Sequence, residues 1–377
     1  MIGDPAVKMA YPEFGMKVTT VNGQSVDGNS ISFKALEKIT VEGEVLDASG
    51  QLVTDFTGIV NPTVKDSKVT VTCLKNSNKD DSPAFTFTDY PNTIFIGNDS
   101  VRNGKFSFTF TVPKDISYSN LQGKMNLYAV DTESGNEAQG NFDNFIVGGT
   151  SDTAETDTIG PEIRALYLND TTFVDGGQVN TTPYFVAELW DKSGVNITGS
   201  SVGHDMMLVI DESTVLSYNL NSYYELLPGE DGTGIVKFPI PALEPGKHTA
   251  EFWVWDILNN STVRTFTFEV VEGLKPFLFD VIATPGIARE QVTFHLMHNR
   301  PESRMRVGIM VYDLAGRQLW KHEESGTSGL FENYTVSWDL TSGGARMRPG
   351  VYIYRAAIST DNSKDATKAR KFIILGE

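Results

Sequence analysis

The chain has 377 residues, which is too long for one hydrophobic core at roughly 100–200 residues per domain, so two to four domains are expected. The 48 Asp and Glu against 31 Lys and Arg give a net charge of −17, which argues against nucleic acid or an anionic membrane as partner of the whole molecule. One cysteine excludes an internal disulfide framework and a cysteine-rich metal site. No stretch approaches the ~20 apolar residues of a transmembrane segment, and the first residues do not resemble a signal peptide.

Apolar and polar residues alternate with period two along the chain, and no segment shows a capped helical stripe. In chain order, the alternation predicts strands at 34–45, 68–73, 106–111, 125–130, 142–147, 162–168, 184–190, 206–210, 247–256, 263–271, 292–297, 307–312, 334–338, 351–358 and 371–375. We therefore predict an all-β chain of three immunoglobulin-like β-sandwich domains in series. Their predicted bounds are 13–148, 161–273 and 274–377, with a polar linker at 149–160.

Charge separates the last module from the rest. Residues 273–377 hold 14 Lys and Arg against 11 Asp and Glu, a net +3, so residues 1–272 carry −20. A shift of this size indicates a module boundary and a different surface task on each side.

Histidine and cysteine are the two residue types in this chain that could indicate catalysis. His204 and Asp205 are neighbours, but adjacent residues on a strand point to opposite faces, and no nucleophile lies near them in the sequence, so a structural histidine is favoured. Cys73 lies on the same strand face as Val69 and Val71, which predicts a buried, inert thiol. No catalytic, cofactor-binding or metal-binding residue is predicted.

Calcium is the one cofactor left open. Asp191 and Asn196, followed by Asp205 and Asp211, offer oxygen ligands at a sandwich rim. They lack the spacing and terminal Glu of a calcium loop. The Asp-x-Ser-Gly start of this segment is favoured as a plain turn between strands.

The last module resembles the C-terminal sorting domain of type IX secretion cargo in Bacteroidota. Six blocks carry this resemblance in order and spacing: 275–277, 284–285, 311–317, 336–339, 348–355 and 371–375. Each block also has a local structural reason, such as a tight turn at 313–316 and a large core residue at Trp338.

The middle module, at 191–196 and 203–205, resembles the PorU-like type IX secretion sortases, which are gingipain-like cysteine peptidases. Residues 1–12 are similar to the exit from the caspase-like catalytic domain of that family. The resemblance implies that the export signal and the catalytic Cys and His lie upstream, so whether this chain belongs to an enzyme is left open. It places the chain at the cell surface, on the extracellular face of the outer membrane.

The family cleaves sorting domains from exported cargo and attaches the cargo to anionic lipopolysaccharide. The resemblance therefore implies two partners: a PorV-like outer-membrane β-barrel, and cargo sorting domains through the parent protein. By this analogy, module 274–377 docks to the barrel. The candidate docking residues are Arg317, Trp338, Arg348, Gly350, Tyr352 and Arg355.

Two other interpretations stay open at this point. A secreted surface, adhesion or glycan-binding protein with a cleavable type IX sorting domain would have the same last module. Exposed aromatics in a row would favour glycan binding, but Trp253 and Trp255 share one strand face and are more simply core residues. The third interpretation is a calcium-dependent enzyme accessory.

Overall fold

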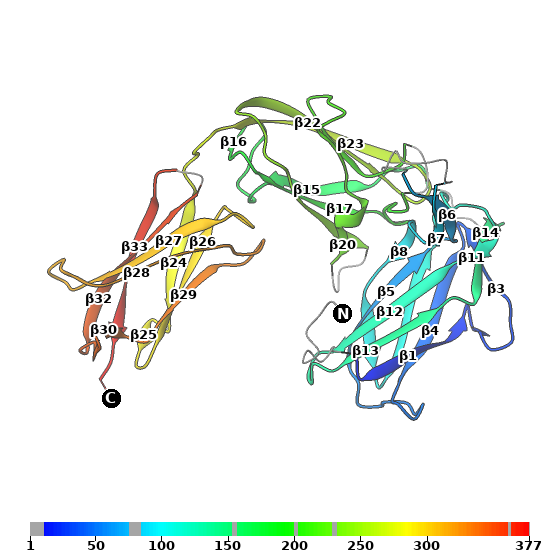
Figure 1. Cartoon of the computed structure of the whole chain (residues 1–377), viewed down its shortest axis with the longest axis horizontal. Helices are drawn as coiled ribbons and strands as arrows, with labels where there is room; N and C mark the ends of the chain where they lie inside the picture. The colour runs from blue at the N-terminus through cyan, green and yellow to red at the C-terminus, as the bar shows by residue number, and fades with distance from the viewer. Residues whose placement is uncertain are drawn as a thin grey trace. The chain divides into compact units, whose positions relative to one another are not determined.

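The computed structural model describes residues 11–74, 84–152, 157–199, 203–227, 232–360 and 363–376. Of the predicted exit segment 1–12, residues 1–10 lie outside these ranges. The described residues form strands, turns and loops, and their only helix is the single 3-10 turn η1 (Asn221–Tyr223). The predicted all-β, immunoglobulin-like fold class is confirmed (Figure 1).

The first third of the chain forms a large curled sheet with two small ones. Its strands are β1 (Phe14–Val21), β2 (Gln24–Ser25), β3 (Ile31–Ala35), β4 (Lys38–Leu46), β5 (Gly58–Lys65), β6 (Val69–Thr72), β7 (Thr86–Asp89), β8 (Thr93–Ile96), β9 (Asp99–Arg102), β10 (Lys105–Thr111), β11 (Leu121–Gln122), β12 (Lys124–Asp131), β13 (Glu137–Phe142) and β14 (Phe145–Thr150). The large sheet has the order β12-β13-β1-β4-β10-β9-β5-β8, and pairing of β12 with β5 closes it on itself. The small sheets are β11-β14-β3 and the β6–β7 hairpin.

Apolar residues at every second position of the strands form the core of this region. Phe106, Phe108 and Phe110 are buried on β10, while the Ser and Thr residues between them are exposed, as predicted. Two predicted strands are each split. Leu36 has a φ of 64°, which ends β3 before β4 begins, and residues 143–144 separate β13 from β14.

The middle strands form one four-stranded and one five-stranded sheet. The strands are β15 (Glu162–Leu168), β16 (Gln178–Val179), β17 (Tyr184–Trp190), β18 (Met207–Ile210), β19 (Ser217–Asn219), β20 (Tyr224–Leu226), β21 (Thr233–Pro239), β22 (Gly246–Trp255) and β23 (Ser261–Val270). The sheet orders are β15-β17-β21-β20 and β16-β23-β22-β18-β19. β22 is central, as its apolar residues on both faces predict.

The last strands form a three-stranded and a five-stranded sheet. The strands are β24 (Leu278–Thr284), β25 (Ile287–Ala288), β26 (Val292–His298), β27 (Met305–Tyr312), β28 (Gln318–Gly326), β29 (Tyr334–Trp338), β30 (Thr341–Ser342), β31 (Ala345–Arg346), β32 (Gly350–Ser359) and β33 (Ala366–Ile374). The orders are β24-β26-β29 and β25-β33-β32-β27-β28, with β30–β31 as a separate hairpin. One apolar cluster, which includes Phe294, Ile309 and Phe372, fills the space between the two sheets.

The chain divides into two compact units. One comprises residues 1–165, 187–236 and 251–265, and the other comprises 166–186, 237–250 and 266–377. The boundary between the units runs through strands of the middle sheets. The three domain boundaries drawn from the sequence stay a prediction. Within the described ranges, no helix is long and apolar enough to cross a membrane.

Candidate functional site

The candidate docking residues of the C-terminal sheets fall into two groups. Arg317, Arg348 and Arg355 are exposed, and Gly350 opens strand β32. Arg317 closes the tight turn predicted at 313–316, where its Nε lies 3.1 Å from Oδ2 of Asp313. These positions are open to a partner, and their docking role stays a prediction.

Trp338 and Tyr352 are buried, so their prediction as direct docking contacts is corrected. Trp338 is 4% exposed, stacks on Trp320 at 4.5 Å between ring centroids, and donates Nε1–H to the carbonyl of Thr341 at 2.8 Å. Tyr352 is 8% exposed and donates its hydroxyl to the carbonyl of Arg348 at 2.7 Å. Both side chains project inward from their strands, so they support the sheets and present no surface to a partner.

The outward side of the five-stranded sheet β25-β33-β32-β27-β28 carries apolar residues. Ile287, Val351 and Ile353 are 55%, 39% and 38% exposed. Cross-strand register joins Ile287 to Ile373 and Ile373 to Val351. Together with the pairing of β32 with β27, this register brings together side chains from four separate segments of the chain, which no sequence pattern could indicate.

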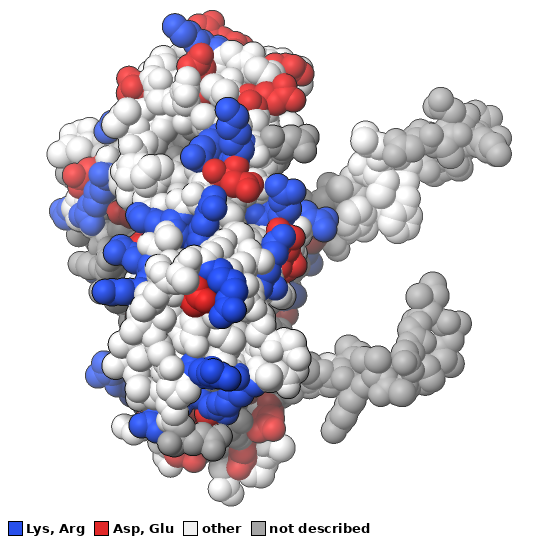
Figure 2. All heavy atoms as spheres, turned by 90° about the vertical axis from the view of Figure 1, so that its left-hand side faces the viewer, with Lys and Arg blue, Asp and Glu red and all other residues white. Residues whose placement is uncertain are grey.

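Basic residues flank these apolar positions. Register places Lys371 and Tyr312 on either side of Ile353, and Met310 beside Arg355. We call this set the C-terminal face: Ile287, Met310, Tyr312, Val351, Ile353, Arg355, Lys371 and Ile373. Figure 2, which views the molecule from the left-hand side of Figure 1, shows Lys and Arg spread over this side among uncharged areas, with some Asp and Glu beside them.

The residues that left calcium open are not gathered into one set. Asp191 Oδ1 accepts hydrogen bonds from the backbone N–H and hydroxyl of Ser193 and from the N–H of Gly194, which confirms the plain turn. Asn196 Oδ1 accepts from Thr198, and Asp205 Oδ1 accepts from Asn221. These hydrogen bonds tie Asp191 and Asn196 to their own loops and Asp205 to the 3-10 turn η1.

Asp191 instead meets two other carboxylates. Oxygens of Asp157, Asp191 and Asp256 all lie within 4.8 Å of one another. Burial raises the pKa of Asp256, and the negative charge of Asp191 raises it further. A proton or a cation would relieve this repulsion, and calcium binding is untested.

His204 has a carboxylate partner, but that partner is not its neighbour Asp205. Its Nδ1 lies 2.6 Å from Oδ2 of Asp115, and its ring lies 4.5 Å from that of Trp255. Asn259 donates Nδ2–H to the other oxygen of Asp115 at 2.9 Å. In the described part of the chain, no serine, threonine or cysteine side chain hydrogen-bonds His204, so the arrangement fits the structural role.

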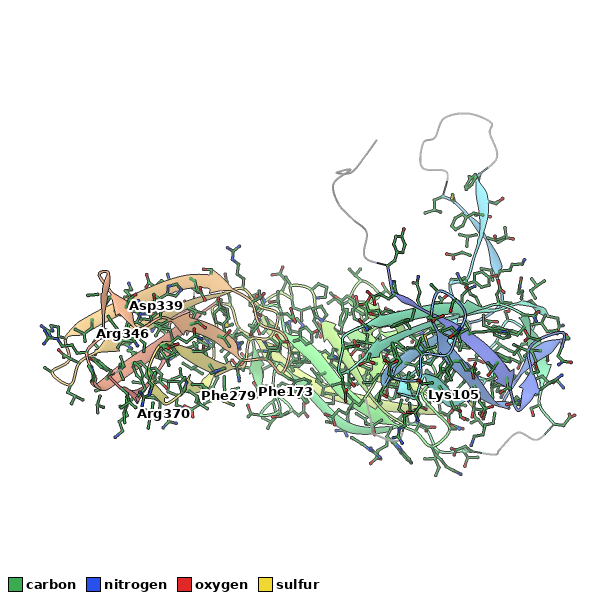
Figure 3. The ribbon with its side chains drawn as sticks, turned by 90° about the horizontal axis from the view of Figure 1, so that it is seen from below. Lys105, Phe173, Phe279, Asp339, Arg346 and Arg370 are labelled. Carbon is green, nitrogen blue, oxygen red and sulfur yellow. The ribbon has the colours of Figure 1, made fainter. Side chains whose placement is uncertain are left out.

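The prediction that Cys73 is buried is wrong. Cys73 is exposed, and Val69 and Val71 on the same strand face are only half-buried. The reason is the β6–β7 hairpin, a separate two-stranded sheet that projects from the N-terminal strands (Figure 3). Alternation identified the strand but could not show that neither face of this hairpin is covered by a second layer.

No family model matches the chain, and no curated protein matches it. Among solved structures, the dimeric latent PorU from Porphyromonas gingivalis is 38% identical, with 100% of this chain and 35% of that chain covered and a TM-score of 0.44. The tetra-tandem repeat in the extending region of a large adhesion protein is 14% identical, with 97% and 74% covered and a TM-score of 0.20. The glucan-utilization protein SGBP-B from Bacteroides ovatus, in complex with a mixed-linkage heptasaccharide, is 9% identical, with 96% and 71% covered and a TM-score of 0.28.

The last two likenesses carry no argument about function, because both identities and both TM-scores are low. The likeness to PorU rests on sequence identity over the full length of this chain. The chain is therefore related to PorU along its whole length, and it spans 35% of the PorU chain.

Proposed function

We propose that the chain is the non-catalytic C-terminal region of a PorU-like type IX secretion sortase, in which it serves as spacer and docking arm. The observation that carries this proposal is the 38% identity to PorU over 100% of the chain. The chain spans only 35% of PorU, so the activity of such a parent protein belongs to the proposal as well.

In this proposal, the parent is a gingipain-like cysteine peptidase at the extracellular face of the outer membrane. It cleaves sorting domains from cargo and attaches the cargo to anionic lipopolysaccharide. The catalytic Cys and His belong to a domain upstream of residue 1. The C-terminal strands form a sorting-type domain that binds a PorV-like outer-membrane barrel protein.

Two structural features support a docking role for the C-terminal strands. They enclose their own apolar core, so they can hold a surface in a fixed shape. The C-terminal face leaves apolar and basic side chains accessible on one side of that core. A scaffold with a rigid core and one uncovered sheet face is suited to binding a partner.

Binding to a purified PorV-like protein from the same organism tests the proposal. The full chain is immobilised, and the barrel protein in detergent is passed over it. Saturable binding that depends on the folded chain is the expected result. No binding at micromolar barrel concentration, with a folded chain and a folded barrel, would contradict the docking role.

The second candidate is secreted cargo, a surface or glycan-binding protein whose sorting domain is removed. Exposed aromatic rings in a row would favour glycan binding; none of the five tryptophans is exposed, whereas the stacked rings of Phe85 and Phe87 are. Trp253 and Trp255 are half-buried, and the ring of Trp255 packs against His204. Native protein that ends before residue 274 would favour this candidate over the sortase region.

A further inference from the structure

We propose that the C-terminal face is the surface that contacts the docking partner, and that the partner presents an apolar patch bordered by carboxylates. This inference rests on the proposed function and names the residues that would perform the docking. The argument uses only the strands β24–β33, which lie within one compact unit.

The first step is the direction of the side chains on β32. Tyr352, Tyr354 and Ala356 are buried, so the residues that alternate with them point away from the core. Those residues are Val351, Ile353 and Arg355, all exposed. Two of the three are aliphatic, which is unusual for strand positions that face solvent alone.

The second step is continuity across strands. Ile353 pairs with Tyr312 on β27 and with Lys371 on β33. Val351 pairs with Ile373, which pairs with Ile287 on β25. The apolar side chains therefore form one band across four strands, and uncovered contiguous apolar surface is typical of an interaction site.

The third step is charge. Several basic residues near this sheet have carboxylate partners: Arg370 lies 2.8 Å from Asp280, Arg306 3.5 Å from Asp365, and Lys321 2.9 Å from Glu323. Arg355 and Lys371, in contrast, form no ion pair with any described residue. Both border the apolar band, so an incoming carboxylate would find them unpaired.

The smaller sheet offers an internal comparison. Its outward side carries Thr293, Thr335 and Ser337, and the hydroxyls of Thr293 and Ser337 are 2.9 Å apart. Ile282 and Met297 are 48% and 38% exposed there, but polar residues separate them, since Ile282 pairs with His295 and Met297 with Asp280. Hydroxyl-rich strand faces are suited to water, so the two sides of this fold differ in the chemistry they present.

A protein surface fits the C-terminal face better than a lipid surface does. Residues 1–272 carry −20 and would be repelled by an anionic membrane. A protein can place a few carboxylates opposite Arg355 and Lys371 without presenting a wide negative field. Arginine beside apolar residues is also a composition enriched in protein interfaces.

The test uses the full chain and the purified PorV-like protein in detergent. Ile353→Ser removes an apolar contact from the face, and Arg355→Glu and Lys371→Glu reverse its two unpaired charges. On the outward side of the smaller sheet, Ile282→Ser is the matched control for Ile353→Ser, and Thr335→Glu introduces a carboxylate as a control for the charged variants. Unfolding midpoints show that each variant is folded, since surface substitutions usually shift stability by less than about 0.5 kcal/mol.

The inference predicts that each face variant binds about tenfold or more weakly, while both control variants bind like the parent chain. Charge reversal should also flatten the salt dependence of binding. If the parent chain binds and the face variants bind equally well, this inference is overturned and the proposed function stands. If the folded parent chain does not bind, both are overturned.

Sedimentation with phosphatidylglycerol vesicles is the second arm of the test. The inference predicts that the parent chain and the face variants stay in the supernatant alike. Binding to these vesicles that is lost in Arg355→Glu and Lys371→Glu would overturn the choice of a protein partner.

Discussion

Nδ1 of His204 lies 2.6 Å from Oδ2 of Asp115, although the two residues are 89 positions apart in the chain. Asp115 is 8% exposed and follows β10, and His204 precedes β18. The hydrogen bond therefore joins the segment after a strand of the N-terminal sheet to the start of a middle strand, within one compact unit.

Removal of the histidine leaves a buried carboxylate with fewer donors. We expect His204→Ala to lower the free energy of unfolding by about 1–3 kcal/mol. His322→Ala is the matched control, because His322 and Glu324 lie 3.0 Å apart with side chains 41% and 37% exposed. That exposed pair should contribute no more than about 1 kcal/mol. Urea unfolding measures both, and equal losses would contradict a structural role for the buried pair.

His298 makes stability depend on pH. Burial, together with the nearby charge of Arg300, lowers the pKa of His298 from 6.5 to about 4. Its Nδ1 accepts the backbone N–H of Arg300 at 3.1 Å, and Nε2 donates to the hydroxyl of Ser328 at 2.8 Å, so the folded protein holds the neutral ring.

The unfolded chain binds a proton at His298 before the folded chain does. The stability from the neutral ring is therefore complete above pH 6.5, falls as the pH drops, and is lost below about pH 4. The shift corresponds to a loss on the order of 3 kcal/mol. His298→Asn should flatten this part of the profile in urea unfolding between pH 4 and 7. An unchanged slope in the variant would assign the pH dependence to other groups.

The positions of the strands could be predicted from the sequence more completely than their pairing and the burial of their faces. Three predicted strands coincide with β15, β17 and β29, because each alternates cleanly or is bounded by turn residues. β28 was not predicted, since Gln318–Gly326 is mostly polar and looks like a loop in sequence. A strand that covers only one edge of a sheet needs few apolar residues, so its sequence carries little signal.

The exposure of the candidate docking residues could be predicted only in part. Arg355, a docking candidate from the sequence, is exposed on the C-terminal face, whereas Trp338 and Tyr352 point inward. On β32, tyrosines alternate with Val351 and Ile353, so both faces are apolar and period two cannot show which one is buried. Only the pairing of β32 with β27 and β33 resolves the ambiguity.

Cys73 should react readily in the folded protein. The thiol is exposed on the β6–β7 hairpin, so we expect about one equivalent of a thiol reagent such as DTNB to react without denaturant. Cys73→Ser supplies the blank. A reaction that begins only after urea is added would mean that the hairpin is covered in solution.

Trp338 should matter for stability and not for docking. Trp338→Ala removes a buried ring that stacks on Trp320, and we expect a loss of about 3–5 kcal/mol in the free energy of unfolding. After correction for the folded fraction, binding to the PorV-like protein should be unchanged. Trp338→Phe, which restores part of the volume, should recover part of the stability. A binding defect in the stable Trp338→Phe variant would contradict a purely structural role and indicate that Trp338 takes part in docking.

The carboxylate trio should not require calcium. Both oxygens of Asp256 accept hydrogen bonds from its own turn, and Oδ1 of Asp191 accepts three from the turn that follows it. We therefore expect the same thermal midpoint in chelator and in millimolar calcium. A ligand that binds the folded state alone must raise the midpoint. A rise that Asp157→Asn abolishes would identify Asp157, Asp191 and Asp256 as a cation site.

The intact mass of the native protein, purified from the cells that produce it, tests the central claim most directly. The account predicts a mass far above the 41.5 kDa of this chain, with a catalytic domain upstream and strand β33 retained at the C-terminal end. A mature protein that lacks an upstream domain and ends before residue 274 would contradict it and identify the chain as secreted cargo.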